Sequence, residues 1–303
     1  MHWLSGVQEG LRTLIGRSNT TERVIRLCVS CNKVVGETAS ECPHCGAQQT
    51  QSARFIKQLS ADLPDVTRVS PLLIGVMVML YVTEGLMSMG RPDFSLYRFL
   101  LTGDRETSAL LGGLHGYFVQ MGGQWWRLIN ANFLHFGAIH LFFNLSALRV
   151  LGPMVEEEYG SGWFFFTYVY TGICGFYASY WYHPEVFTVG ASASLFGLIG
   201  VGIGYAYRER ARRAAQLRVL LQWAVIGIGI GFVDLIPMNN AAHIGGLAAG
   251  LGFGLLLSPR EATRRGFFRS AGLVLGYLSV AVAFSSFVFA VLQSDVTRTL
   301  LSQ

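Results

Sequence analysis

Charged side chains are scarce in this sequence. Asp, Glu, Lys and Arg make up 14% of its 303 residues, whereas hydrophobic residues make up 51%. Soluble domains are usually about 25% charged, and the mean hydropathy here is +0.41. So little charge excludes an ordinary soluble globule and indicates a protein that exposes apolar side chains to lipid.

The N-terminal segment lacks a long apolar run. Residues 1–27 are polar and partly amphipathic, and they contain no stretch that could form the core of a signal peptide. We therefore expect the N-terminus to stay in the cytosol. Residues 47–69 are also polar and are typical of a linker.

Cysteine is rare and unevenly placed. Four of the five cysteines lie within 18 positions, and the fifth, Cys174, lies in an apolar segment. This placement argues against a disulfide framework and is typical of a metal site. The clustered residues form two C-x-x-C pairs separated by ten residues, namely Cys28, Cys31, Cys42 and Cys45.

These paired cysteines predict a zinc ribbon over residues 28–46. Two C-x-x-C turns can place four thiolates tetrahedrally around one zinc ion, at about 2.3 Å from each sulfur. Four protein ligands close the site, so the predicted zinc is structural and holds together a module too small to have its own core. His44 lies between two of the cysteines and could replace one of them. The alternative is four unrelated thiols or redox pairs.

From Ser70 onward, long apolar runs alternate with short polar segments. Each run has about 17 to 24 residues, enough to cross a hydrocarbon core of roughly 30 Å as a helix. Lipid cannot satisfy exposed backbone groups, and the runs lack the alternation of barrel strands. We therefore predict an all-α polytopic membrane protein with seven transmembrane helices. The seven runs are 70–90, 136–154, 162–181, 191–207, 217–234, 241–258 and 270–293.

The placement of arginine predicts the orientation in the membrane. The connection after the fourth run has five Arg between positions 208 and 218, and the one after the sixth has four between 260 and 269. Because basic residues mark cytoplasmic loops, we expect these connections and the N-terminus inside, and Gln303 outside. The long first connection, residues 91–127, is then outside although it contains four Arg. Its aromatic residues favour the membrane interface.

A few polar side chains interrupt the apolar runs. His140 and Asn144 lie on one helix face of the second run, Ser192 begins the fourth, and His243 lies near the start of the sixth. Polar groups inside a membrane are costly and are functional candidates by default. Taken singly, each could also be a helix cap or a hydrogen-bond partner between helices.

Glycines of the fourth and sixth runs indicate that Ser192 and His243 lie close together. Ser192 shares one helix face with Gly200 and Gly204, and His243 shares one with Gly250. If these faces meet, the helices pack closely, and Ser192 and His243 lie at the same depth near the outer side. A serine beside an imidazole is the minimum arrangement for an activated nucleophile. A helix that begins at Ser192 would also place free N–H groups where an oxyanion could bind.

Five motifs, in this order along the chain, resemble the rhomboid family of intramembrane serine proteases. The resemblance covers roughly residues 70–258. The motifs are Trp126-Arg127 in the first connection, His135-x(4)-His140-x(3)-Asn144, Glu158-Tyr159-Gly160-Ser161, Gly190-x-Ser192 followed by Phe196-Gly197, and Ala242-His243-x-Gly245-Gly246-Leu247 with Gly250.

The resemblance implies a six-helix core over residues 70–258, with the seventh helix in residues 259–303 outside it. It implies Ser192 as nucleophile and His243 as general base, in a dyad without Asp. The Ser192 N–H, His140 and Asn144 would form the oxyanion hole, and catalysis would need no metal or other cofactor. The implied activity is cleavage of single-span membrane proteins near the outer membrane face. The expected partners are these substrates and the lipid bilayer, with no nucleic acid.

Two positions depart from the family pattern. Ala193 follows the nucleophile where the family usually has Gly, and its methyl group could crowd an oxyanion or the substrate backbone. Phe196 replaces a frequent Tyr but keeps the ring that could stack on His243. The alternative function is therefore a catalytically inactive rhomboid-like protein that binds clients.

Two further alternatives concern the nucleophile and the protein class. Ser194 could act in place of Ser192, but two residues along a helix rotate by about 200°, so it is expected to point away from His243. A transporter or channel with a regulatory zinc module would favour charged residues at mid-membrane or repeated halves, and the sequence shows neither.

Overall fold

The computed structural model describes residues 25–28, 33–36, 39–44, 46, 68–233, 238–263 and 267–302. The chain forms two compact units, Met1–Asp65 and Val66–Gln303. The division falls within residues 47–69, the segment predicted as a linker. Each unit is described by itself.

The described part of the small unit contains a two-stranded antiparallel sheet. Strand β1 (Ile25–Leu27) pairs with β2 (Val34–Gly36). Cys28 directly follows β1, and its N–H donates to the Lys33 carbonyl at 2.8 Å. Cys28 therefore stands at the start of the connection between the two strands.

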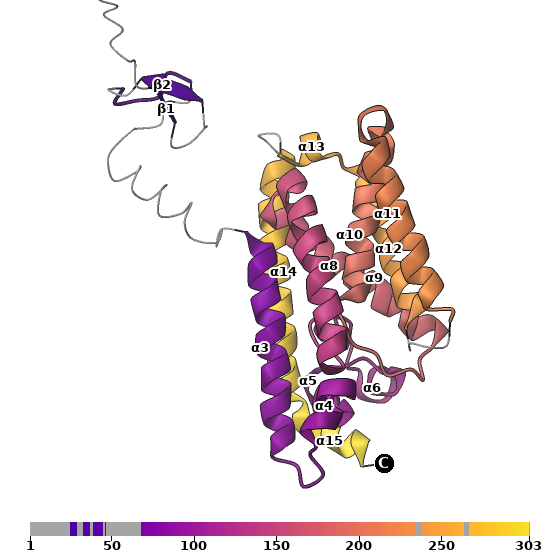
Figure 1. Cartoon of the computed structure of the whole chain (residues 1–303). Coiled ribbons are helices and arrows are strands. Elements are labelled where there is room, and N and C mark those ends of the chain that lie inside the picture. The colour runs from indigo at the N-terminus through magenta and orange to yellow at the C-terminus, as the bar shows by residue number, and fades with distance from the viewer. Residues whose placement is uncertain are drawn as a thin grey trace, which may run out of the picture. The chain divides into compact units, whose positions relative to one another are not determined.

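The large unit is a bundle of long helices with a group of short helices at one end (Figure 1). The helices are α3 (Val69–Met89), α4 (Leu96–Thr102), α5 (Arg105–Leu111), α6 (Gly116–Gly122), α7 (Arg127–Asn130), α8 (Gly137–Tyr159), α9 (Ser161–Tyr182), α10 (Ser192–Arg208), α11 (Arg210–Ile230), α12 (Asn240–Leu256), α13 (Pro259–Thr263), α14 (Phe267–Leu292) and α15 (Ser294–Leu301).

A helix occupies each of the seven segments predicted to cross the membrane, namely α3, α8, α9, α10, α11, α12 and α14. Three of them, α3, α8 and α14, are long and apolar enough to span a bilayer by length and composition alone. The two helices of the candidate site, α10 and α12, have only 17 residues each. The fold is therefore mostly helical with candidate membrane helices, and the count of seven crossings stays a prediction.

Helix α11 begins earlier than the apolar run from which it was predicted. The run starts at residue 217, whereas the helix starts at Arg210. Arginine is a good helix former, so helical backbone continues through the basic segment, with a break in the helical angles at Arg213 (φ −118°, ψ 21°). Most of the predicted Arg-rich connection is therefore helical. Hydropathy indicates where a membrane boundary lies but not where a helix ends.

The long first connection is also more ordered than the pattern of apolar runs indicates. It folds into the short helices α4 to α7. Local caps explain two of them: the Ser95 hydroxyl accepts from the Arg98 N–H, and the Asp104 carboxylate accepts from the Glu106 N–H at 3.1 Å. These helices gather at the end of the bundle where α15 also lies (Figure 1).

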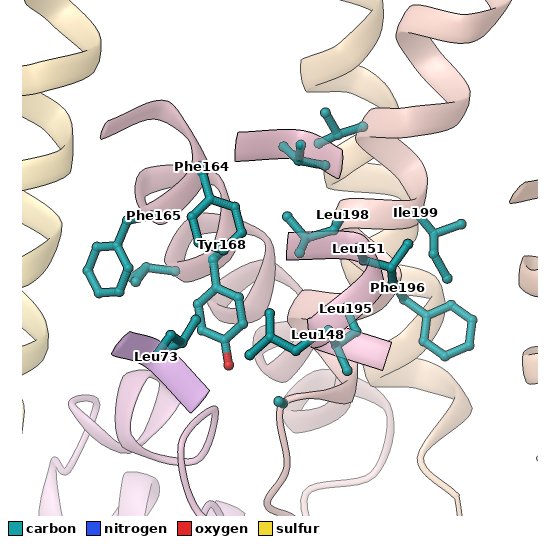
Figure 2. Packing of buried hydrophobic residues seen from close by; sticks show 14 of the residues in the cluster. Leu73, Leu148, Leu151, Phe164, Phe165, Tyr168, Leu195, Phe196, Leu198 and Ile199 are labelled. Carbon is teal, nitrogen blue, oxygen red and sulfur yellow. The ribbon is translucent and has the colours of Figure 1, made fainter. Parts of the chain in front are cut away.

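Helix α10 forms the centre of the bundle. Every residue from Ala193 to Ala206 is buried, as expected for a helix that is apolar on all sides. Side chains of α8, α9 and α10, including Leu148, Tyr168 and Leu195, pack together in this core (Figure 2). The centre of the unit is thus the helix that begins at the candidate nucleophile.

At their glycines, helices α10 and α12 approach each other too closely for a side chain to fit between them. A methyl group at Gly250 would overlap the carbonyl of Gly197, and one at Gly200 would overlap the carbonyl of Leu247. The two predicted glycine faces do meet. This contact sets the spacing of the helix ends at which Ser192 and His243 lie.

Candidate active site

The candidate nucleophile is the first residue of α10. The chain enters the helix through Gly190, whose φ of +133° is a conformation that favours glycine. The Gly190 N–H donates to the Ala131 carbonyl at 2.8 Å, which fixes this turn beside the end of α7. Ala191 is the N-cap and Ser192 follows it. The first N–H groups of a helix have no partner within the helix, and in α10 they begin at Ser192.

His243 lies near the start of α12 and faces this serine. The Asn239 side chain caps the helix by accepting from the Ala242 N–H at 3.1 Å, and its amide donates to the Ser179 hydroxyl at 2.6 Å. The cap therefore ties the start of α12 to α9. With α12 held in this way, His243 Nε2 lies 2.9 Å from the Ser192 hydroxyl oxygen.

The imidazole of His243 is buried and stacked. It is 2% exposed, and its ring lies 4.4 Å from that of Phe196, with 19° between the planes. Among the residues that the structure describes, its Nδ1 has no hydrogen-bond partner. When the serine hydroxyl donates to Nε2, the proton of the neutral ring is on Nδ1. The described contacts therefore fit a pair of residues, Ser192 and His243, without a third side chain hydrogen-bonded to the ring.

The two histidines of the second-helix motif contact the turn before α10. The His140 ring lies against Gly190, where a methyl group would come within 2.6 Å of its Cε1 atom. His135 Nε2 accepts from the Ala191 N–H at 3.4 Å, and the two imidazoles meet edge to face at 5.2 Å. Asn144 donates to the His140 carbonyl at 2.9 Å. Its side-chain nitrogen carries two hydrogens, which leaves the second for another acceptor.

Ser194 is directed elsewhere. Its hydroxyl lies 2.8 Å from Asn132 Oδ1 and 2.7 Å from the Tyr168 carbonyl, and the residue is fully buried. Neither of these contacts involves His243. This agrees with the expectation that Ser194, two residues after Ser192 on the helix, does not reach His243.

The methyl group of Ala193 packs between helices. Ala193 belongs to a hydrophobic cluster with Phe176 and Ala242. A methyl group at Gly175 of α9 would come within 2.9 Å of the Ala193 side chain. The absence of a side chain at Gly175 thus provides the room that the extra methyl at position 193 needs.

Two of the four predicted zinc ligands lie among the described residues. Cys28 and Cys42 are buried in one small cluster with Val35, and the His44 N–H points to the Cys42 sulfur at 3.4 Å. Sulfur that accepts from backbone N–H is suited to a thiolate ligand, so these residues fit a metal module. The other two predicted ligands, Cys31 and Cys45, lie outside the described residues.

Sequence reasoning missed two asparagines that shape the site. Asn132 holds the hydroxyl of Ser194, and Asn239 caps the helix that carries His243. Both are polar residues beside apolar runs. The criterion that singled out His140 and Asn144 would have found them had it been applied to the residues flanking each run as well as to those inside it.

Comparison with known proteins adds to this geometry. Residues 122–260 match the Rhomboid domain. The chain is 37% identical to rhomboid protease GluP of Bacillus subtilis over 146 residues, which are 48% of this chain and 28% of that protein. It is 31% identical to RHOMBOID-like protein 7 of Arabidopsis thaliana over 179 residues, 57% of this chain and 56% of that one. It is 33% identical to RHOMBOID-like protein 5 of the same plant over 181 residues, 57% and 58% of the two chains.

The matches cover only part of each protein. This chain spans between 28% and 58% of the length of the three relatives named. The small unit, helices α3, α4 and α5, and helices α14 and α15 lie outside the matched domain. Within these bounds, the chain contains a segment that matches the Rhomboid domain, is similar to rhomboid-family proteins over that part, and has candidate membrane helices.

Proposed function

We propose that this protein is an intramembrane serine endopeptidase that uses Ser192 and His243. The observation that carries the proposal is the distance of 2.9 Å between the serine hydroxyl and His243 Nε2. A serine hydroxyl is a weak nucleophile until a neighbouring base removes its proton. An imidazole nitrogen within hydrogen-bond distance, held by the ring of Phe196, meets that requirement.

The reaction then proceeds in two halves. Ser192 Oγ attacks the carbonyl carbon of the scissile peptide while His243 Nε2 takes the hydroxyl proton. Collapse of the tetrahedral intermediate breaks the C–N bond, and His243 returns the proton to the leaving amine. Water then attacks the carbonyl carbon of the acyl-enzyme while His243 takes a proton from it. Collapse of the second intermediate releases the carboxylate product, and His243 returns the proton to Ser192.

The negative oxygen of each tetrahedral intermediate needs donors on the opposite side of the carbonyl. We assign this role to the Ser192 N–H at the start of α10, to His140 and to the side-chain amide of Asn144. The contact of the His140 ring with Gly190, and the second hydrogen on the Asn144 amide, support this assignment. The positive end of the α10 dipole points to the same place.

The substrates we propose are single-span membrane proteins, cleaved near the outer face of the membrane. Ser192 and His243 lie at the starts of α10 and α12 and not at mid-helix. The arginine distribution predicts that this end of both helices is extracytoplasmic, because the Arg-rich segments lie at the opposite ends.

A fluorophosphonate probe, which reacts with activated serines, tests the proposal. The full chain in detergent should be labelled, and Ser192→Ala should not be. Coexpression with a panel of tagged single-span proteins should yield fragments with the wild type alone. A folded wild-type protein that is neither labelled nor able to cleave any substrate would overturn the proposal and favour the client-binding alternative.

We also propose that residues 28–46 bind one structural zinc ion through Cys28, Cys31, Cys42 and Cys45. The burial of Cys28 and Cys42 in one cluster supports this. Metal analysis of the full chain under reducing conditions should give one zinc per chain, and Cys42→Ser should release it while the labelling of Ser192 persists. Wild-type protein that contains no zinc would contradict the assignment.

A further inference from the structure

A buried polar cluster joins the C-terminal helix to the first loop. It consists of Gln124, Arg127 and Thr297, all of them fully buried, and is called the Arg127 cluster here. Arg127 donates from Nε to Gln124 Oε1 at 2.7 Å and from Nη2 to Thr297 Oγ1 at 3.2 Å. Gln124 Nε2 donates to the same hydroxyl oxygen at 3.2 Å. Thr297 belongs to α15, outside the matched rhomboid domain.

Every hydrogen-bond acceptor of Arg127 in the described part of the chain is neutral. Besides Gln124 and Thr297, the guanidinium donates from Nη1 to the carbonyls of Ala109 and Gly113, each at 2.7 Å. It also lies 4.1 Å above the ring of Phe118. A buried cation is tolerated only where its N–H groups are bonded. The Thr297 hydroxyl is therefore one of a small set of groups that fix this arginine.

Two further bonds run from the same loop to the C-terminal helices. Trp126 donates from its indole nitrogen to Gln293 Oε1 at 3.0 Å. The Asn130 amide donates to the Leu111 carbonyl at 2.8 Å and to the Ser286 carbonyl of α14 at 3.3 Å. Helix α7 and the residues before it are thus bonded to three residues of the C-terminal segment, namely Ser286 of α14, Gln293 between the helices and Thr297 of α15.

The loop held in this way is bonded in turn to the entry of the nucleophile helix. Leu114 forms an antiparallel bridge with Thr188, with N···O distances of 3.0 and 2.9 Å. It directly follows Gly113, whose carbonyl accepts from Arg127. Ala131, just after α7, accepts from the Gly190 N–H. Thr188 and Gly190 lie four and two residues before Ser192. A shift of the arginine would therefore be transmitted to the backbone that sets the nucleophile.

We propose that Thr297 is a positioning residue for Ser192: through Arg127, the C-terminal helix α15 holds the loop that fixes the start of α10. The inference rests on the proposed function, because it assigns Thr297 an effect on the reactivity of Ser192. It gives the C-terminal segment a part in the active site although that segment touches neither Ser192 nor His243.

The test compares the rate of fluorophosphonate labelling in matched variants of the full chain. Thr297→Val keeps the shape of the side chain but removes the acceptor of Arg127 and Gln124. Since a catalytic group displaced by about 1 Å can lose 10²-fold in rate, we expect labelling to slow by roughly tenfold to a hundredfold. Thr297→Ser keeps the hydroxyl and should restore most of the rate.

Thr299 provides the matched control on the same helix. It is exposed, and in the part of the chain that the structure describes its hydroxyl donates only to the Asp295 carbonyl of its own helix, at 2.9 Å. Thr299→Val should be labelled at the wild-type rate. The fraction of protein labelled at the end point separates the two explanations of a slow variant: positioning changes the rate and leaves the end point unchanged, whereas loss of folded protein lowers the end point.

The outcomes are distinct. Labelling of the wild type together with an unchanged rate in Thr297→Val would overturn this inference alone. A folded wild type that is never labelled would overturn the proposed function and the inference with it. Should Thr297→Val not accumulate as folded protein, Gln293→Met serves instead. It removes the acceptor of Trp126 and should also slow labelling without lowering the end point.

Discussion

The two sides of the candidate site are built by opposite means. Where Gly200 of α10 and Gly250 of α12 face the other helix, no side chain lies between the helices and the backbones touch. Between the first loop and the C-terminal helices, the contact is made by buried polar side chains around Arg127. One interface sets the distance from Ser192 to His243, and the other holds the turn that leads into Ser192.

The difference determines how each interface responds to change. Close glycine packing tolerates no added atom, because the neighbouring backbone cannot move aside without separating the helices. A hydrogen-bonded cluster tolerates a change of shape but not the loss of a donor or acceptor, since a buried polar group without a partner is costly. Substitutions can therefore test the two interfaces separately.

The largest effect is expected where the two chemical groups meet. Ser192→Ala and His243→Ala should each abolish proteolysis, a loss of about 10⁶-fold where such pairs have been dissected, and the double variant should be no worse because the two residues act as one unit. Cleavage of a tagged single-span substrate measures this. Unequal losses that add in the double variant would contradict a shared mechanism.

The next largest effect is expected at the glycine interface. Gly250→Ala would place a methyl group against the Gly197 carbonyl. Overpacking of this kind costs about 1–3 kcal/mol and should push α12 away from α10. Both the thermal stability and the labelling rate of Ser192 should fall.

Gly252 is the matched control for this change. It lies in the same helix, and a methyl group there meets nothing within 4 Å. Gly252→Ala should keep the labelling rate and raise helix stability slightly, because Ala is the better helix former. Equal losses in the two alanine variants would show that backbone contact does not set the spacing of the dyad.

A smaller loss is expected from Asn144→Ala. Removal of one oxyanion donor typically lowers turnover by about 10²–10³-fold, and three donors share the charge here, so the loss should be of that size or less. The variant also loses the bond to the His140 carbonyl, which lies within a helix and keeps its backbone partner. Turnover of a cleavable substrate gives the measure, and an unchanged turnover would remove Asn144 from the oxyanion hole.

The contrast between the interfaces also explains what the sequence could predict. Glycines repeated at four-residue spacing, with Ser192 and His243 on the same faces, are a periodic signal that can be read without a structure. The Arg127 cluster has no such signal, because Gln124 and Thr297 are 173 positions apart and are ordinary polar residues. The start of α11 differs from the start of its apolar run for a related reason: hydropathy reports contact with lipid and not the extent of a helix.

The smallest effect is expected from Ser194→Ala, and it sharpens the assignment of the nucleophile. Ser194 lies two residues after Ser192, and its hydroxyl bonds Asn132 and the Tyr168 carbonyl, away from His243. Its loss leaves the Asn132 oxygen without this donor, a cost of about 1–3 kcal/mol in stability, but it removes no atom that touches the imidazole. The variant should therefore melt at a lower temperature than the wild type and still label at nearly the wild-type rate. Both variants should be measured in one assay. If Ser194→Ala is folded but unlabelled while Ser192→Ala is labelled, the nucleophile is Ser194. That result would invalidate the helix register on which the mechanism depends.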